Sequence, residues 1–227
     1  MTQINNHRRV NDILLGPLER PTLKWLASHM PAWVTPDTCT MVGVLGSLGV
    51  ATSYVLTVYD RNFLWLASLG FVVNWLGDSL DGTLARHRRI ERPIYGFFVD
   101  HTIDAFSVSI IVLALGLTPY VTFAVACLML IAYLLLSVLV FVRTSAVGEF
   151  KISYSKLGPT EIRVFAILLN TAMYFGGVET SLAALGLFSQ IPVNPYDLFL
   201  AILALLLLCF FIVTAIQETR KLAKENK

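Results

Sequence analysis

Charge is scarce in this 227-residue sequence. Only 14% of the residues are Asp, Glu, Lys or Arg, whereas an average soluble domain has about 25%. This shortage argues against an ordinary soluble domain, and a net charge of +2 is too small to indicate a nucleic-acid partner.

Cysteine is also rare. Cys39, Cys127 and Cys209 form no CxxC pair, so the sequence indicates neither a disulfide framework nor a cysteine metal site.

Apolar residues are correspondingly abundant in the sequence. They make up 56% of the chain, and the mean hydropathy is +0.70, which excludes a disordered protein. Six stretches reach the length of about 20 residues that a helix needs to cross a bilayer. They cover residues 38–59, 62–85, 95–117, 119–142, 162–184 and 196–216. The sequence therefore predicts an all-α, polytopic membrane protein with six transmembrane helices.

The chain divides into three parts by this pattern. We expect a cytoplasmic or interfacial helical segment at 1–37, a six-helix transmembrane domain at 38–217 and a basic cytoplasmic tail at 218–227. Within the first part, residues 8–30 resemble an interfacial amphipathic helix pair, interrupted at Pro17 and Pro21, with its apolar side toward the acyl chains.

The basic residues predict the orientation. If the N-terminus is cytoplasmic, 16 of the 17 Lys and Arg residues fall on the cytoplasmic side and only Arg61 falls outside. This follows the positive-inside rule and predicts that both termini are cytoplasmic. We expect an integral membrane location, which would be the inner membrane in a bacterium. Gly43, Gly46 and Gly49 form a smooth strip that favours close helix packing, including a homodimer contact.

Four of the 15 acidic residues lie inside predicted spans: Asp78, Asp81, Asp100 and Asp104. A carboxylate in the hydrocarbon region costs about 2.5–3.5 kcal/mol on insertion scales, so intramembrane carboxylates usually have a function. Together the four would repel one another unless a cation neutralises them.

The spacing of these residues predicts one site. Asp78 and Asp81 are three residues apart and Asp100 and Asp104 are four apart, so each pair shares a helix face. Asp78 lies about 12 Å from the cytoplasmic end of its helix and Asp100 about 9 Å from the same surface. An oxygen-only cluster of this kind suits a hard divalent cation such as Mg²⁺. With Arg86 nearby, two cations would clamp a pyrophosphate, which predicts phosphoryl transfer on the cytoplasmic side.

Two segments carry a more specific signal. Asp-Ser-Leu-Asp-Gly-Thr-Leu-Ala-Arg at 78–86 and Gly-Phe-Phe-Val-Asp-His-Thr-Ile-Asp at 96–104 resemble the D-x-x-D-G-x-x-A-R … G-x-x-x-D-x-x-x-D signature of the CDP-alcohol phosphotransferase family. Nine residues separate Arg86 from Gly96, where eight are commonest, so the departure falls in the basic loop. Six spans after a juxtamembrane helix also match the family plan.

The resemblance implies a role for each matching residue. The four aspartates would hold two Mg²⁺ ions, for which Mn²⁺ could substitute, and Gly82 and Arg86 would contact the CDP moiety. Thr35–Thr40 resembles the first-helix segment of the family, in which Asp37 and Thr40 would bind the nucleotide. The alternative for Asp37 and Thr40 is a helix N-cap with its first turn.

The resemblance leaves the catalytic base open. In phosphatidyltransferase members the last aspartate, here Asp104, is the proposed acceptor of the alcohol proton. The choline/ethanolamine branch instead has a His after the third aspartate, and His101 stands at that position. A His titrates near neutrality, which suits a base. The alternative is a His bonded to a neighbouring helix.

A second segment also resembles the choline/ethanolamine branch. It is the Gly-Pro-Thr-Glu sequence at 158–161. The alternative interpretation of this segment is a simple helix start, with Pro159 in the first turn and Glu161 near the positive end of the helix dipole. Lys151, Lys156 and Arg163 around it could bind a phosphate or only follow the positive-inside rule.

Two reactions fit these observations. In the favoured one, a CDP-choline or CDP-ethanolamine donor transfers its phospho-alcohol to diacylglycerol and releases CMP. In the other, CDP-diacylglycerol reacts with a soluble alcohol such as glycerol phosphate, inositol phosphate or serine. A divalent-cation transporter is a remote alternative, since the outer halves of the predicted helices have almost no ionisable groups.

Overall fold

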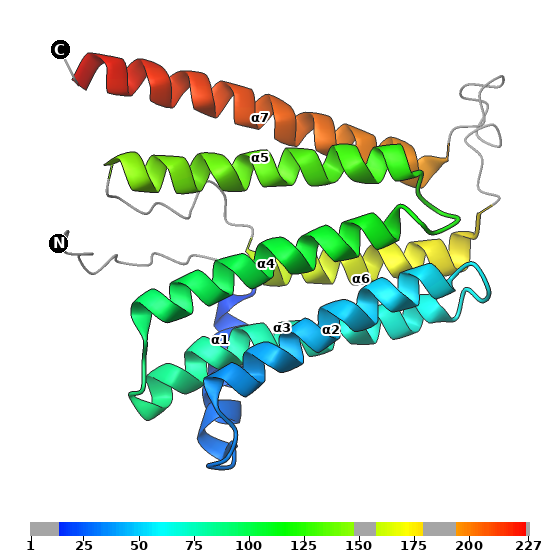
Figure 1. Cartoon of the computed structure of the whole chain (residues 1–227). Coiled ribbons are helices and arrows are strands. Elements are labelled where there is room, and N and C mark those ends of the chain that lie inside the picture. The colour runs from blue at the N-terminus through cyan, green and yellow to red at the C-terminus, as the bar shows by residue number, and fades with distance from the viewer. Residues whose placement is uncertain (1–13, 148–157, 179–193, 226–227) are drawn as a thin grey trace.

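The computed structural model describes residues 14–147, 158–178 and 194–225. Within these ranges every regular element is a helix, so the predicted all-α class is confirmed. The helices are α1 (Gly16–His29), α2 (Pro36–Leu56), α3 (Phe63–Arg88), α4 (Pro93–Leu115), α5 (Phe123–Val147), α6 (Pro159–Gly176) and α7 (Pro195–Glu225). In Figure 1 the helices α2 to α7 share one general direction, and α1 runs across it.

Five helices in the described part of the chain are long and apolar enough to cross a membrane: α2, α3, α4, α5 and α7. The protein is therefore an integral, multi-pass membrane protein. In the most apolar windows of α2 and α3, 39% of the residues are buried, against 17% for α4, α5 and α7. The low burial of the last three helices leaves many large apolar side chains exposed, as expected for helices that contact lipid.

Two predicted details are wrong. The fifth predicted span, 162–184, is too long, because α6 ends at Gly176 and Gly177 adopts φ +68°, a left-handed conformation that glycine tolerates. Residues 179–184 of that span lie outside the described residues. The predicted interruption at Pro17 and Pro21 is also absent. Both prolines belong to α1, Pro17 in its first turn and Pro21 in its interior. Residues 8–13 of the predicted pair lie outside the described residues.

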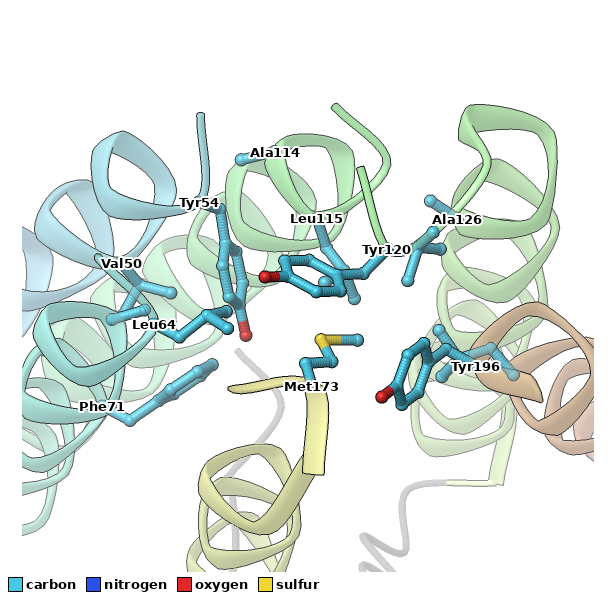
Figure 2. Close-up of a cluster of buried hydrophobic side chains, with 13 residues drawn as sticks. Val50, Tyr54, Leu64, Phe71, Ala114, Leu115, Tyr120, Ala126, Met173 and Tyr196 are labelled. Atoms are coloured by element: carbon cyan, nitrogen blue, oxygen red, sulfur yellow. The ribbon is translucent and has the colours of Figure 1, made fainter. Parts of the chain in front are cut away.

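The main apolar core lies between the helices from α2 to α7 (Figure 2). Tyr54, Leu64, Phe71 and Met173 converge there with residues from the α4–α5 connection and the start of α7. Tyr54, Leu64 and Met173 are at most 1% exposed. This core therefore brings α6 against α2 and α3, although α6 is separated from them by two other helices in sequence.

α2 and α3 pack with their backbones in near contact. A Cβ atom on Gly46 would lie 2.5 Å from the backbone nitrogen of Asn74, and one on Gly77 would overlap the backbone of Cys39 and Gly43. Gly43 and Gly46 thus serve the close packing that the sequence predicts. Gly49 differs, because a Cβ added there would meet nothing within 4 Å.

One carboxylate joins α1 to α3 and α6. Glu19 of α1 accepts hydrogen bonds from Trp75 Nε1 (3.1 Å), Ser79 Oγ (3.0 Å) and Thr160 Oγ1 (3.0 Å). Beside it, Leu23 and Ala27 pack in a small apolar cluster with residues of α2 and α3. α1 is therefore attached directly to the residue that follows Asp78.

Candidate active site

Three of the four predicted metal-ligand aspartates come together. Asp78 of α3 and Asp100 and Asp104 of α4 each offer a carboxylate oxygen, and these oxygens lie within 4.8 Å of one another. All three residues are partly buried. Asp100 and Asp104 share one face of α4 because they are four residues apart, as the sequence predicts.

Asp81 is engaged with other groups. Its Oδ2 accepts a hydrogen bond of 2.7 Å from the Thr40 hydroxyl, and its Oδ1 accepts a hydrogen bond from the backbone N–H of Gly82. It is therefore not one of the three converging carboxylates, although the sequence predicts a four-residue set. Asp81 instead joins the site to the first turns of α2.

The predicted nucleotide-binding residues lie at the start of α2. Thr35 caps this helix: its hydroxyl accepts from Thr38 N (3.2 Å), and its own N–H donates to Thr38 Oγ1 (2.9 Å). Asp37 and Thr40 thus follow the N-cap in the first turns of α2, and their side chains also contact groups outside this helix. Thr40 bonds Asp81, and Asp37 forms an ion pair with Arg92 of the α3–α4 connection.

Gly82 and Arg86 lie one turn apart on α3. A Cβ on Gly82 would lie 3.2 Å from Arg86 Nη1, so the guanidinium passes directly over the glycine. Arg86 is exposed, and its Nη2 donates to Thr83 Oγ1 at 3.2 Å. Gly96 of α4 faces open space, since nothing lies within 4 Å of a Cβ built there. An open glycine face of this kind leaves room for a ligand.

His101 lies between α4 and α5 and beside the acidic cluster. Its Nδ1 is 3.2 Å from Asp100 Oδ2. Its ring packs against Phe97, with 4.3 Å between centroids, and against Phe141 of α5, with 5.3 Å. The ring therefore packs against a neighbouring helix and also lies beside one of the converging aspartates.

Arg163 of α6 is the partner of Asp78 that the sequence did not predict. Its Nη2 donates to Asp78 Oδ2 at 2.6 Å, and its Nε donates to Asn74 Oδ1 at 2.7 Å. Only 12% of the Arg163 side chain is exposed. A signal for this contact does exist in the sequence, because Asn74 precedes Asp78 by one helical turn in an otherwise apolar stretch.

The Gly-Pro-Thr-Glu segment begins α6 and also holds α1. Glu161 accepts hydrogen bonds of 2.9 Å from the N–H of Gly158 and of Leu15. Burial raises the pKa of Glu161, but backbone N–H groups, first that of Leu15, lower it more, so the pKa lies below its ordinary value. This arrangement agrees with the helix-start interpretation. Lys151 and Lys156 lie outside the described residues.

An apolar cavity of about 260 Å³ lies between α3 and α6 and reaches Arg163. Trp75 and Thr160, which both bond Glu19, are among its lining residues. The remaining lining residues are apolar: Phe71, Val72, Val164 and Ile167. The cavity therefore connects an apolar surface with the guanidinium that contacts Asp78.

The chemistry of the cluster fits a divalent cation. Carboxylate oxygens are the donors that hard cations of this class prefer, and the three converging groups are on two rigid helices. The guanidinium of Arg163 contacts one of these carboxylates directly. Such an arrangement can bind a cation and, with it, a phosphate-containing ligand.

Comparisons with known proteins identify a family and several relatives. Residues 33–223 match a family model described as "CDP-alcohol phosphatidyltransferase". Cholinephosphotransferase 1 of Xenopus laevis is 32% identical over 111 residues, which are 45% of this chain and 26% of that protein. The Gallus gallus protein of the same name is 29% identical over 106 residues, 44% of this chain and 31% of the relative. The Mus musculus protein of that name is 29% identical over 126 residues, which are 51% of this chain and 30% of the relative. The matches thus span less than a third of these relatives.

Proposed function

The chain belongs to the CDP-alcohol phosphatidyltransferase family, and from this premise we propose that it is an Mg²⁺-dependent phosphotransferase of phospholipid synthesis. It transfers a phospho-alcohol from a donor of the CDP-choline or CDP-ethanolamine type to a lipid alcohol such as diacylglycerol. CMP is the leaving group. The observation that carries the proposal is the convergence of Asp78, Asp100 and Asp104 within the family signature.

The choice of donor rests on the relatives. The matched proteins bear the name cholinephosphotransferase 1, and His101 and the Gly-Pro-Thr-Glu segment resemble the same branch. The apolar cavity between α3 and α6 gives an acyl chain room beside the site, which supports a lipid as one of the two substrates.

Each residue near the cluster has a part in this reaction. Two bound Mg²⁺ ions, or Mn²⁺ in their place, would neutralise charge on the pyrophosphate and on the leaving oxygen. Asp78, Asp81, Asp100 and Asp104 hold them, and Thr40 keeps Asp81 oriented by a 2.7 Å hydrogen bond. Gly82, Arg86 and Asp37 receive the CDP moiety.

The transfer itself needs a base. The acceptor hydroxyl gives its proton to His101 or to Asp104, and its oxygen bonds to the phosphorus that carries the donor alcohol. The bond between this phosphorus and the CMP oxygen breaks, and CMP leaves with the electron pair. His101 contacts Asp100 at 3.2 Å, and Asp104 is one turn further along α4. Both candidate bases therefore lie at the acidic cluster.

We place the site at the cytoplasmic surface and count α6 as the sixth span. The distribution of Lys and Arg supports cytoplasmic termini. α6 has 18 residues and packs along α3, and local thinning of the bilayer would accommodate so short a crossing. α1 then lies in the interface, across the helix ends. The outward-facing Gly49 offers a contact for a homodimer.

A product assay tests the function. The purified chain is incubated in nanodiscs with Mg²⁺ and pairs of CDP donors and alcohols, and CMP is measured. We expect CMP with CDP-choline or CDP-ethanolamine plus diacylglycerol. If CMP is released only with CDP-diacylglycerol plus a soluble alcohol, the protein is a phosphatidyltransferase. If no pair of substrates yields CMP, both assignments are overturned. Asp100→Asn, which should remain folded and inserted without producing CMP, is the control.

A further inference from the structure

A chain of buried hydrogen bonds leads from α2 through α3 and α6 to the acidic cluster. Asn74 of α3 is its centre and is 7% exposed. Its Nδ2 donates to the backbone oxygen of Gly43 (3.0 Å) and to Ser47 Oγ (2.8 Å), both on α2. Its Oδ1 accepts from Arg163 Nε (2.7 Å) on α6. Both amide hydrogens and the oxygen are thus used, which leaves the amide one orientation.

Asn74 in turn determines how Arg163 meets the cluster. A guanidinium is planar, so a bond to Nε restricts the direction of the two terminal nitrogens. With Nε on Asn74, Nη2 of Arg163 reaches Asp78 Oδ2 at 2.6 Å, the length of a strong charge-assisted bond. A Lys at this position has a single terminal nitrogen and could not hold both partners in this geometry.

We infer that Asn74 and Arg163 are positioning residues that orient the Asp78 carboxylate for a divalent cation. The inference rests on the proposed function. Arg163 binds Oδ2 of Asp78 and thereby fixes how this carboxylate faces a cation shared with Asp100 and Asp104. The positive charge of Arg163 also reduces repulsion among the three carboxylates. Groups that orient a metal ligand typically change metal affinity or activity about 10–100-fold when they are removed.

The same fold provides a matched control. Asn170 of α6 is 1% exposed and also links three helices. Its Oδ1 accepts from the Tyr54 hydroxyl of α2 (2.8 Å), and its Nδ2 donates to Ser68 Oγ of α3 (3.1 Å). Ser68 is ten residues before Asp78, which is about 15 Å along the helix. Loss of Asn170 should therefore weaken helix packing without touching the cluster.

The test compares Asn74→Ala with Asn170→Ala in the full chain, purified in detergent without nucleotide or lipid substrate. Mn²⁺ binding is measured by electron paramagnetic resonance, and the melting temperature by intrinsic fluorescence. Both variants should melt at a lower temperature than the wild type. Only Asn74→Ala should lose Mn²⁺ affinity, by about tenfold or more, and Arg163→Lys should lose it too although the charge is kept.

The outcomes separate this inference from the proposed function. If Asn74→Ala and Asn170→Ala bind Mn²⁺ with equal affinity, Asn74 is only a packing residue and the inference is overturned. A wild type that binds no Mn²⁺ would also overturn the inference. A wild type that binds Mn²⁺ but releases no CMP in any pair would overturn only the proposed function. If Asn74→Ala does not fold, Ser47→Ala and Ser68→Ala form a milder matched pair. The first should weaken Mn²⁺ binding more than the second, and equal binding would overturn the inference.

Discussion

Thr40 on α2 donates a hydrogen bond of 2.7 Å to Oδ2 of Asp81 on α3. The same hydroxyl lies 3.1 Å from the backbone oxygen of Pro36 in its own helix. The contact connects the start of α2 with the first half of the signature segment. It also fixes the orientation of the Asp81 carboxylate relative to α2.

Removal of this hydroxyl should impair the site without unfolding the protein. In Thr40→Val the shape of the side chain is retained, but Asp81 loses a hydrogen-bond donor. We expect CMP release to fall by about tenfold, because Asp81 is no longer oriented. The control is Thr171→Val, since the Thr171 hydroxyl donates to the Ile167 carbonyl of its own helix. Equal rates for the two variants would contradict the role of Thr40.

Substitution of His101 decides between the two candidate bases. Asn retains a nitrogen near the Nδ1 position and hence the contact with Asp100, but it has no group that titrates near neutrality. If His101 accepts the proton, His101→Asn should bind the CDP donor normally and lose turnover by about 10²–10⁴-fold. Single-turnover CMP release and equilibrium donor binding measure the two effects separately. Near-normal turnover would assign the base to Asp104.

Acidification should loosen the attachment of α1 to α6. Glu161 precedes the predicted span that begins at 162, and its pKa lies below the ordinary value because the backbone hydrogen bonds outweigh burial. A lowered pKa stabilises the folded state above the ordinary carboxyl range, and this contribution is lost as the pH falls through the folded-state pKa. The melting temperature should therefore drop with acidification.

Glu161→Gln removes this carboxylate and provides the comparison. The variant should melt below the wild type at pH 7, and the gap in melting temperature should narrow as the pH falls through the folded-state pKa of Glu161. Differential scanning fluorimetry across this range measures the gap. A gap that does not change with pH would assign Glu161 a packing role alone.

The close contact of α2 and α3 predicts unequal effects of two similar substitutions. Gly46→Ala inserts a methyl group 2.5 Å from the backbone nitrogen of Asn74, so the helices must separate. We expect a loss of about 1–3 kcal/mol in stability, as for other overpacked sites. Gly49→Ala meets nothing within 4 Å and should stay within about 0.5 kcal/mol of the wild type. Denaturant melts of the two variants in detergent provide the comparison.

Much of this architecture follows from sequence. Hydrophobic length predicts α2 to α5 and α7, and residue spacing predicts that Asp100 and Asp104 share a face. Spacing alone does not predict how one helix is rotated against another. That rotation decides that Asp78 joins the cluster while Asp81 bonds Thr40. The end of α6 was missed for a different reason, since hydropathy continues beyond Gly176 while the backbone turns at Gly177.

The pairing of Arg163 with Asp78 shows a further limit. A basic residue near a span end is expected on topology alone, so its position in the sequence carries no information about a buried partner. The long side chain of Arg163 reaches Asp78 and Asn74 only because α6 packs on α3. That packing depends on contacts more than 80 residues apart in sequence, such as those of Arg163 itself.

The Glu19 carboxylate has a mechanical consequence for the rest of the molecule. It ties Trp75 and Ser79, midway along α3, to Thr160 in the first turn of α6, so the two helices are joined where α6 begins. They cannot separate there without breaking hydrogen bonds to one shared carboxylate. Any separation of the two helices must therefore start at the other end of α6, near Gly176, with α1 as the hinge.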